Sequence, residues 1–303
     1  MKLLISDGMS KEGIEILQNA GIEILNQKFT PEELLKVIGD YDGILVRSAT
    51  KVTKEVIDAG KNLKVIARGG VGLDNVDVEY AKQKGIKVMN TPGASSISVA
   101  ELAIAHMFAI ARFLYKSTAE MKAGKWPKKE YSEGFELTGK TLGIIGIGNI
   151  GKEVAKRALG LGMKVIAYDP YVTTIDMNVQ LVSKDELLAQ SDIITLHIPK
   201  QKDGYAIAAP EFEKMKNGVV LINCARGGVV SEEDLLNALN SGKVRAAGID
   251  VFANEPPTEA QKELINHPNV SLSPHIGGST PEAQTRIAIE IANKIVDAFK
   301  NLN

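Results

Sequence analysis

The chain has 303 residues, of which 44% are hydrophobic and 24% charged, as in ordinary soluble globular proteins. This length favours two domains. The formal net charge of −1 provides no general attraction to nucleic acid or to an anionic membrane, so we expect neither as a partner. A single cysteine, Cys224, excludes an intramolecular disulfide and a cysteine metal cluster. We therefore predict no metal site and a cytoplasmic location.

The first ninety residues alternate short apolar runs with helix-like segments. We expect strands at 2–6, 22–26, 43–46, 65–67 and 87–90. Helices are expected between them, at 11–20, 31–38, 54–59 and 78–84. Short buried strands that alternate with helices predict a parallel sheet with helices on both faces.

A long helix is expected over 98–115, and it is apolar almost all round. Such a helix must be buried on most sides, which one domain surface does not usually achieve. We therefore expect a homodimer that buries this helix through the domain it belongs to. The alternative is burial between two domains of one chain.

The second half of the chain repeats the alternating pattern. Strands are expected at 141–145, 164–168, 179–181, 193–197, 219–223, 247–250 and 270–272. The final run, 281–299, is an amphipathic helix with Ile287, Ile291, Ile295 and Phe299 four residues apart. This helix could return to the first domain and make that domain discontinuous.

A dinucleotide-binding fingerprint, G-x-G-x-x-G, follows the strand at 141–145 and precedes a helix-like run. Gly146 permits the tight turn, Gly148 lets the backbone approach a pyrophosphate, and Gly151 lets the helix pack against the strand. Backbone N–H groups of Asn149 and Ile150 would bind the phosphates. The alternative is a glycine-rich turn in an ordinary α/β protein.

An acid at the end of the next strand, Asp169, lies about 20 residues beyond the fingerprint, where it would bind the ribose hydroxyls. A carboxylate there repels a 2′-phosphate, so NAD is favoured over NADP. The expected fold is α/β, with two doubly wound parallel-sheet domains. A Rossmann cofactor domain at 96–278 would be inserted in a discontinuous flavodoxin-like substrate domain at 1–95 and 279–303.

Three further segments each follow a predicted strand and carry Arg226, Glu255 and His275. Ligands of doubly wound sheets bind outside the carboxyl ends of the strands, so the three side chains could converge there. A guanidinium can hold a substrate carboxylate, a histidine can exchange the hydroxyl proton, and a carboxylate can orient that histidine. Spacing alone does not establish convergence, and each residue could instead be an ordinary loop side chain.

Motifs along nearly the whole chain resemble the D-isomer-specific 2-hydroxyacid dehydrogenases. They are G-I-G-N-I-G, Y-D-P, L-H-I-P, N-C-A-R-G-G, D-V-F-x-x-E-P and S-P-H-I-G-G-S-T, in that order. The resemblance implies Arg226 on the substrate carboxylate, His275 as acid–base catalyst and Glu255 as its partner. It also implies that backbone N–H groups around Gly70 and Val71 hold the carboxylate.

The predicted site residues fall into cofactor contacts and substrate contacts. The cofactor contacts are Val71, Gly146, Gly148, Asn149, Ile150, Gly151, Asp169, His197, Pro199, Cys224, Ala225, Arg226, Asp250, His275 and Gly277. The substrate contacts are Arg47, Arg68, Gly70, Val71, Arg226 and His275. Within these, Arg47 and Arg68 would bind a substrate phosphate, although Arg47 could be a surface arginine.

Within the family, the segments at 44–52, 68–77 and 88–92 most resemble the D-3-phosphoglycerate dehydrogenases. This implies NAD-dependent oxidation of 3-phospho-D-glycerate to 3-phosphooxypyruvate, the entry to serine synthesis. The alternatives are a glyoxylate or hydroxypyruvate reductase and, in another class, an NAD-dependent corepressor-like binding protein. Because the sequence ends at Asn303, we expect a short form without the regulatory domain that longer relatives carry.

Overall fold

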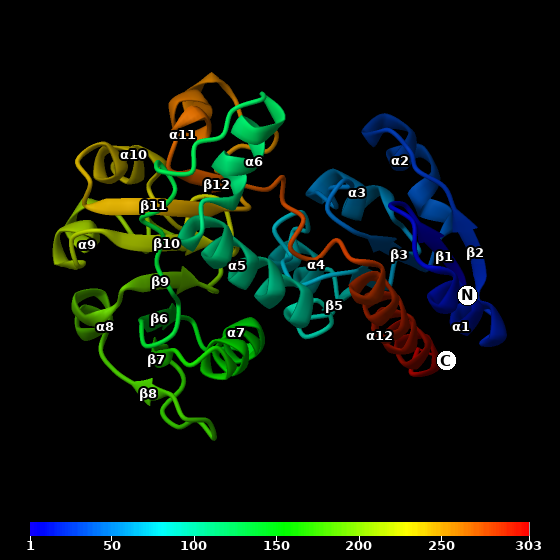
Figure 1. Cartoon of the computed structure of the whole chain (residues 1–303). Coiled ribbons are helices and arrows are strands. Elements are labelled where there is room, and N and C mark those ends of the chain that lie inside the picture. The colour runs from blue at the N-terminus through cyan, green and yellow to red at the C-terminus, as the bar shows by residue number, and fades with distance from the viewer. Residues whose placement is uncertain (303) are drawn as a thin grey trace. The chain divides into compact units, whose positions relative to one another are not determined.

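The computed structural model describes residues 1–302, which divide into two compact units. Unit 1 comprises Met1–Ser96 and the chain from Gly278 onward, and unit 2 comprises Ile97–Gly277 (Figure 1). The boundaries expected from the sequence lie one residue from these. Unit 2 is thus one continuous segment inserted into unit 1.

The sheet of unit 1 has five strands, all paired in parallel, in the order β2-β1-β3-β4-β5. The strands are β1 (Lys2–Ile5), β2 (Glu23–Asn26), β3 (Gly43–Val46), β4 (Val65–Arg68) and β5 (Lys87–Asn90). The chain moves outward from β1 to β2 and then returns to β3 on the other side of β1. A sheet with this reversal of direction is doubly wound.

Helices cover both faces of this sheet. One face carries α2 (Pro31–Val37), α3 (Lys54–Ala59) and α4 (Val78–Gln83), and a short 3-10 turn, η1 (Ile38–Asp40), follows α2. The other face carries α1 (Lys11–Asn19) and α12 (Pro281–Lys300), which lie side by side in blue and red (Figure 1). Residues Ile291, Ile295 and Phe299 of α12 are buried against the sheet.

The sheet of unit 2 has seven parallel strands in the order β12-β11-β10-β9-β6-β7-β8. They are β6 (Thr141–Ile145), β7 (Lys164–Tyr168), β8 (Gln180–Leu181), β9 (Ile193–Leu196), β10 (Val219–Asn223), β11 (Val244–Ile249) and β12 (Val270–Leu272). Its direction reverses between β6 and β9. Two parallel α/β sheets of this kind confirm the predicted fold class.

Alternate strand residues of unit 2 face two separate cores. Ile144 packs toward α5 (Ser96–Ala111) and α7 (Asn149–Gly160), whereas Ile145 packs toward the opposite face. That opposite face is covered by α8 (Lys184–Gln190), α9 (Ala209–Lys214), α10 (Glu232–Asn240) and α11 (Lys262–Asn266), with η2 (Glu259–Gln261) before α11.

The expectation of one continuous helix over 98–115 is wrong. Helix α5 ends at Ala111, and α6 (Leu114–Lys122) continues at an angle of 64°. Phe113 between them has a left-handed backbone, with φ 55°. The carbonyl of Ala111 accepts a hydrogen bond from the N–H of Phe135 at 3.0 Å, so a distant segment replaces the helical donor.

One face of α5 is exposed, although most of the helix is buried. Ile97 and Phe108 are each 39% exposed, and Ala105 lies between them on the same face. Among the described residues no single helix is long and apolar enough to span a membrane, and only the bent pair α5–α6 reaches that length and composition.

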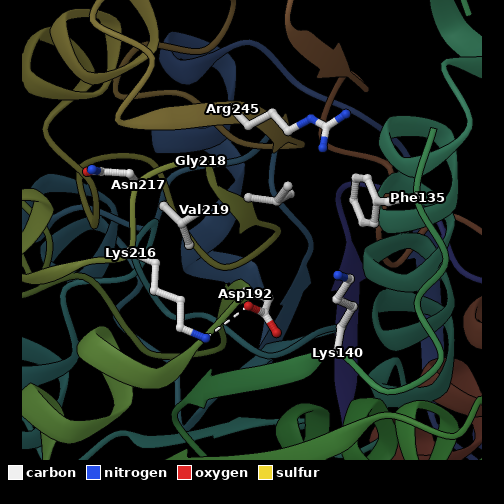
Figure 2. A pocket seen from close by; sticks show the side chains of 9 residues that line it. Phe135, Lys140, Asp192, Lys216, Asn217, Gly218, Val219 and Arg245 are labelled. Atoms are coloured by element: carbon white, nitrogen blue, oxygen red, sulfur yellow. Dashed lines mark hydrogen bonds and ion pairs between the residues drawn. The ribbon is translucent and has the colours of Figure 1, made fainter. Parts of the chain in front are cut away.

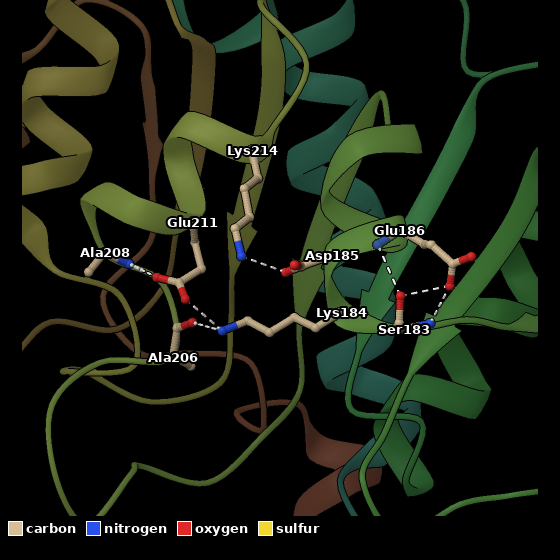
Figure 3. A network of polar contacts seen from close by, with 8 residues as sticks. All are labelled: Ser183, Lys184, Asp185, Glu186, Ala206, Ala208, Glu211 and Lys214. Atoms are coloured by element: carbon tan, nitrogen blue, oxygen red, sulfur yellow. Dashed lines mark hydrogen bonds and ion pairs between the residues drawn. The ribbon is translucent and has the colours of Figure 1, made fainter.

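Ion pairs fix α8 to α9 in unit 2 (Figure 3). Lys184 Nζ lies 2.9 Å from Glu211 Oε1 and donates to the carbonyl of Ala206 at 2.7 Å. Lys214 Nζ pairs with Asp185 at 2.8 Å. These contacts anchor the end of the loop that follows β9, the loop that begins with His197.

Candidate active site

The glycine loop after β6 has the geometry of a dinucleotide cradle. Gly146 has φ +91°, and a Cβ there would lie 2.5 Å from the carbonyl oxygen of His197. A Cβ on Gly151 would lie 2.2 Å from the carbonyl oxygen of Gly146. By contrast, nothing lies within 4 Å of a Cβ built on Gly148, the N-cap of α7. The chain therefore keeps open space beside a helix N-terminus, where phosphates bind.

Asp169 follows β7, and backbone donors fix its carboxylate. Oδ2 accepts the N–H of Ile147 at 3.0 Å, and Oδ1 accepts the N–H of Tyr171 at 2.9 Å. Each oxygen of a carboxylate can accept two hydrogen bonds, so each retains a lone pair for a ribose hydroxyl. The first of these bonds also ties Asp169 to the glycine loop.

His197 lies just beyond β9 at the same edge of the sheet. Its Nε2 is 2.9 Å from Thr195 Oγ1, while the structure gives its buried Nδ1 no hydrogen-bond partner among the residues it describes. Burial lowers the pKa of His197 to about 3, so the ring is neutral. A buried nitrogen without a partner beside the glycine loop fits a bound dinucleotide, which could complete it.

Glu255 and His275 are in direct contact. His275 Nδ1 lies 2.6 Å from Glu255 Oε2, and both side chains are partly exposed. The other oxygen, Oε1, accepts the N–H of Phe252 at 3.1 Å, which anchors the carboxylate to its own loop. Of the two ring nitrogens of His275, Nδ1 is the one that this contact uses. An apolar pocket of about 460 Å³ adjoins the pair and is lined partly by Pro256 and Leu272.

Asp250, at the end of β11, holds the turn that carries His275. Its carbonyl accepts the N–H of His275 at 2.8 Å, Oδ1 accepts that of Ile276 and Oδ2 that of Gly277, each at 2.9 Å. His275 has φ +53°, a left-handed conformation that costs a non-glycine residue on the order of 1–3 kcal/mol. The bonds from Asp250 offset that cost.

The loop after β10 places Arg226 beside the loop that carries Glu255. A Cβ on Gly227 would lie 1.7 Å from the carbonyl oxygen of Phe252, so only glycine permits this packing. Arg226 Nη1 donates to the carbonyl of Ala225 at 2.7 Å. Burial raises the pKa of the Cys224 thiol, which argues against a reactive thiolate.

The predicted substrate residues of unit 1 lie at the carboxyl ends of its strands. Arg68 ends β4, and a Cβ on Gly70 would lie within 1.6 Å of Arg68 Nη1, so the guanidinium covers this glycine. Gly70 has φ +140°, and the carbonyl of Val71 accepts a hydrogen bond from Asn90. Arg47 follows β3 and lines a pocket of about 260 Å³.

Two residues near Arg47 were not predicted. Asp7 Oδ2 accepts the N–H of Arg47 at 2.7 Å and that of Thr50 at 3.0 Å. Asn75 Nδ2 donates to the carbonyls of the same two residues. Together they fix the loop that carries Arg47. Asp7 is an acidic residue just after the first strand, and this position was the sequence signal that could have identified it.

A further pocket lies at the opposite, amino-terminal edge of the unit 2 strands (Figure 2). There Lys216 pairs with Asp192 at 2.9 Å, and Arg245 lies over the ring of Phe135. Lys140 also lines this pocket. It contains none of the predicted site residues. Lys216 neutralises Asp192, whose other oxygen accepts the N–H of Thr141 at the start of β6.

Comparison with known proteins agrees with this geometry. The family model described as D-isomer specific 2-hydroxyacid dehydrogenase, NAD binding domain, matches residues 104–277. The chain belongs to this family. Unit 2 accordingly contains its NAD-binding domain.

Among curated relatives, hydroxypyruvate reductase from Thermotoga maritima is 52% identical over 98% of this chain and 97% of its own length. D-3-phosphoglycerate dehydrogenase from Archaeoglobus fulgidus is 46% identical over 100% of this chain, which spans only 58% of that relative. A solved glyoxylate reductase from Paecilomyes thermophila is 33% identical, with a TM-score of 0.91 over 100% of this chain and 96% of its own.

Proposed function

We propose that the protein is an NAD-dependent dehydrogenase of a three-carbon 2-hydroxy acid, with 3-phospho-D-glycerate as its substrate. The observation that carries the reaction class is the 2.6 Å contact between His275 and Glu255 in an NAD-binding domain. The arginines at the strand ends of unit 1 support a phosphorylated substrate.

In the oxidising direction, His275 Nε2 takes the proton of the C2 hydroxyl. Glu255 holds Nδ1 and stabilises the imidazolium that forms. Arg226 binds the substrate carboxylate and polarises the neighbouring carbonyl. Bound NAD supplies the hydride acceptor. Reduction of a keto acid runs through the same residues, with His275 as the proton donor.

Phosphate recognition is assigned to Arg47, with Arg68 in support, because charge-assisted donors suit a phosphate. Asp7 and Asn75 hold the backbone of the Arg47 loop in place. The guanidinium of Arg68 covers Gly70, beside the backbone assigned to the substrate carboxylate.

A second candidate is a hydroxypyruvate or glyoxylate reductase. It is favoured by the 52% identity to the Thermotoga maritima hydroxypyruvate reductase, which matches this chain almost end to end. The two candidates share the glycerate skeleton and differ in the group at C3. A corepressor-like protein of the same family would bind NAD without steady turnover.

We also propose a homodimer formed through unit 2. Several large apolar side chains are exposed between residues 97 and 126: Ile97, Phe108, Leu114, Met121 and Trp126. Monomeric proteins rarely expose so many apolar side chains in one stretch, so a second copy of the chain is the proposed cover.

A substrate panel tests the proposed function. NADH formation is measured with D-2-hydroxy acids with and without a 3-phosphate, and NADH consumption with hydroxypyruvate and glyoxylate. We expect 3-phospho-D-glycerate to give the highest kcat/KM, and His275→Ala to lower kcat roughly 10²–10⁴-fold. Preference for unphosphorylated acids would favour the reductase, and no turnover with any substrate would favour the binding protein.

A further inference from the structure

A buried histidine on α5, His106, lies in a polar network that the reaction does not directly use. Its side chain is 4% exposed, and both ring nitrogens are occupied. Nδ1 lies 2.9 Å from Ser271 Oγ, and Nε2 lies 2.9 Å from Ser273 Oγ. A Cβ on Gly248 would lie 2.8 Å from His106 Cβ, so the sheet leaves room for this ring.

The network continues from Ser273 to Asp250. Ser273 Oγ donates to Asp250 Oδ1 at 2.6 Å, which uses the only hydroxyl hydrogen of Ser273. His106 Nε2 must therefore carry a hydrogen and donate to Ser273. Burial lowers the pKa of His106, and in the neutral ring Nδ1 then accepts the hydroxyl of Ser271. The order of donors is Ser271, His106, Ser273 and Asp250.

Asp250 is the residue that holds the left-handed turn of His275 through its carbonyl and both carboxylate oxygens. A donor on Oδ1 fixes the rotation of that carboxylate, and the carboxylate fixes the N–H groups of Ile276 and Gly277. Every link lies within unit 2, and His106 is 4% exposed, Ser273 8% and Asp250 1%.

We infer that His106 is a positioning residue, which acts through Ser273 and Asp250 to aim the imidazole of His275 at the reacting hydroxyl. This rests on the proposed role of His275 as the acid–base group. His106 itself touches neither substrate nor cofactor. Small displacements of a reacting group can cost on the order of 10²-fold in rate, so loss of the network should lower kcat.

The test compares five variants with the wild type, using the panel substrate with the highest turnover. We expect His106→Leu and Ser273→Ala each to lower kcat roughly ten- to hundredfold while the Kd for NADH changes less than about threefold. His106→Gln, which keeps a donor and an acceptor, should retain kcat within about threefold of the wild type. The double variant should be no slower than either single one, because both remove the same link.

Ser271→Ala is the matched control. It removes a buried partner of His106 and should lower thermal stability, but it leaves the link to Asp250 intact and kcat within about threefold. Ser273→Ala keeps the imidazole of His106. If His106→Leu does not fold, the kcat of Ser273→Ala therefore decides the test. Equal kcat losses in Ser271→Ala and Ser273→Ala would overturn the inference, as would unchanged kcat in His106→Leu and Ser273→Ala.

Nitrogen NMR of the labelled wild-type protein gives a readout independent of turnover. We expect a neutral His106 ring with its hydrogen on Nε2. A hydrogen on Nδ1 would overturn the donor order and with it the inference. Absence of turnover in the wild type would contradict the proposed function instead, so the two failures are distinguishable.

Discussion

Glu255 holds His275 Nδ1 with one carboxylate oxygen, at 2.6 Å, and the N–H of Phe252 with the other. The carboxylate that orients the imidazole is thus itself anchored to its own loop. The same loop packs so tightly on Gly227 that a side chain there would collide with the carbonyl of Phe252. Three strand ends of unit 2 therefore share one rigid set of contacts.

Removal of the Glu255 carboxylate should slow hydride transfer. Glu255 Oε2 holds Nδ1 of His275 at 2.6 Å, so it fixes the orientation of the imidazole. A misplaced reacting group can cost on the order of 10²-fold in rate, and Glu255→Gln should therefore lower the rate roughly tenfold or more. Stopped-flow measurement of NADH formation would show this. Glu259→Gln is the exposed-acid control and should keep the wild-type rate. Equal rates in all three proteins would contradict the pairing.

Cofactor choice should depend on Asp169. Its two oxygens are already oriented by the N–H groups of Ile147 and Tyr171, so the negative charge is fixed beside the glycine loop. We expect kcat/KM to favour NAD over NADP in the wild type, and Asp169→Ala to reduce that preference roughly tenfold or more, about 1.4 kcal/mol. Asp176→Ala, at an exposed position of the same unit, should retain it. Equal efficiency with both cofactors in the wild type would refute the assignment.

The partly buried ring of His197 should make the protein less stable in acid. Its pKa is lowered by burial to about 3, whereas the unfolded chain takes up the proton near pH 6.5. Below about pH 6.5 the unfolded state therefore binds more protons, and stability falls as pH falls toward 3. Urea unfolding between about pH 5 and 8 should show a smaller pH dependence in His197→Gln than in the wild type. Parallel curves would mean that His197 titrates alike in both states.

Substitutions on the two faces of α5 should have different effects, one on dimer formation and the other on folding stability. Phe108 lies on the exposed face, while Ile104 is only 8% exposed and belongs to the core. Phe108→Glu should yield a folded monomer, whereas Ile104→Glu should lower thermal stability by burying an unpaired charge. Analytical ultracentrifugation and thermal unfolding would measure the two effects. A wild-type protein that is monomeric at micromolar concentration would disprove the dimer.

Substrate phosphate should be recognised by Arg47. A hydrogen bond to a charged group contributes on the order of 1.5–3 kcal/mol, so Arg47→Ala should lower kcat/KM for 3-phospho-D-glycerate roughly ten- to hundredfold. Activity on an unphosphorylated acid should change little. Lys51→Ala, which removes an exposed cation from the same loop, is the control. If both substrates lose activity equally in Arg47→Ala, this arginine is structural.

Much of the fold was predictable because its determinants are local. Buried parallel strands are short apolar runs, and turn residues separate them, so the strands of both sheets appear in the sequence within a few residues. The break at Phe113 was not predictable in this way. It depends on the N–H of Phe135, and on bonds from Tyr115 and Lys116 to Pro268 and Asn269, more than 150 residues away in the chain.

In the candidate site, too, residues within local motifs were predictable, and residues brought together by tertiary packing were not. Sequence motifs identify the glycines and the strand-end residues, among them Gly146, Arg226 and His275. The partners of His106 did not, because Ser271 and Ser273 look like ordinary strand residues and lie 165 and 167 positions away. Only the packing of α5 on β12 and its loop brings them together.

The placement of α12 sets an order for folding during synthesis. Unit 2 is a continuous segment, so its sheet can be completed as soon as β12 has left the ribosome. Unit 1 cannot, since one face of its sheet is covered by Ile291, Ile295 and Phe299, which are translated later. The core that Leu3 and Ile5 share with α1 therefore stays incomplete while the whole inserted unit is made. The core formed by the first strands is thus completed only by the last helix to be translated.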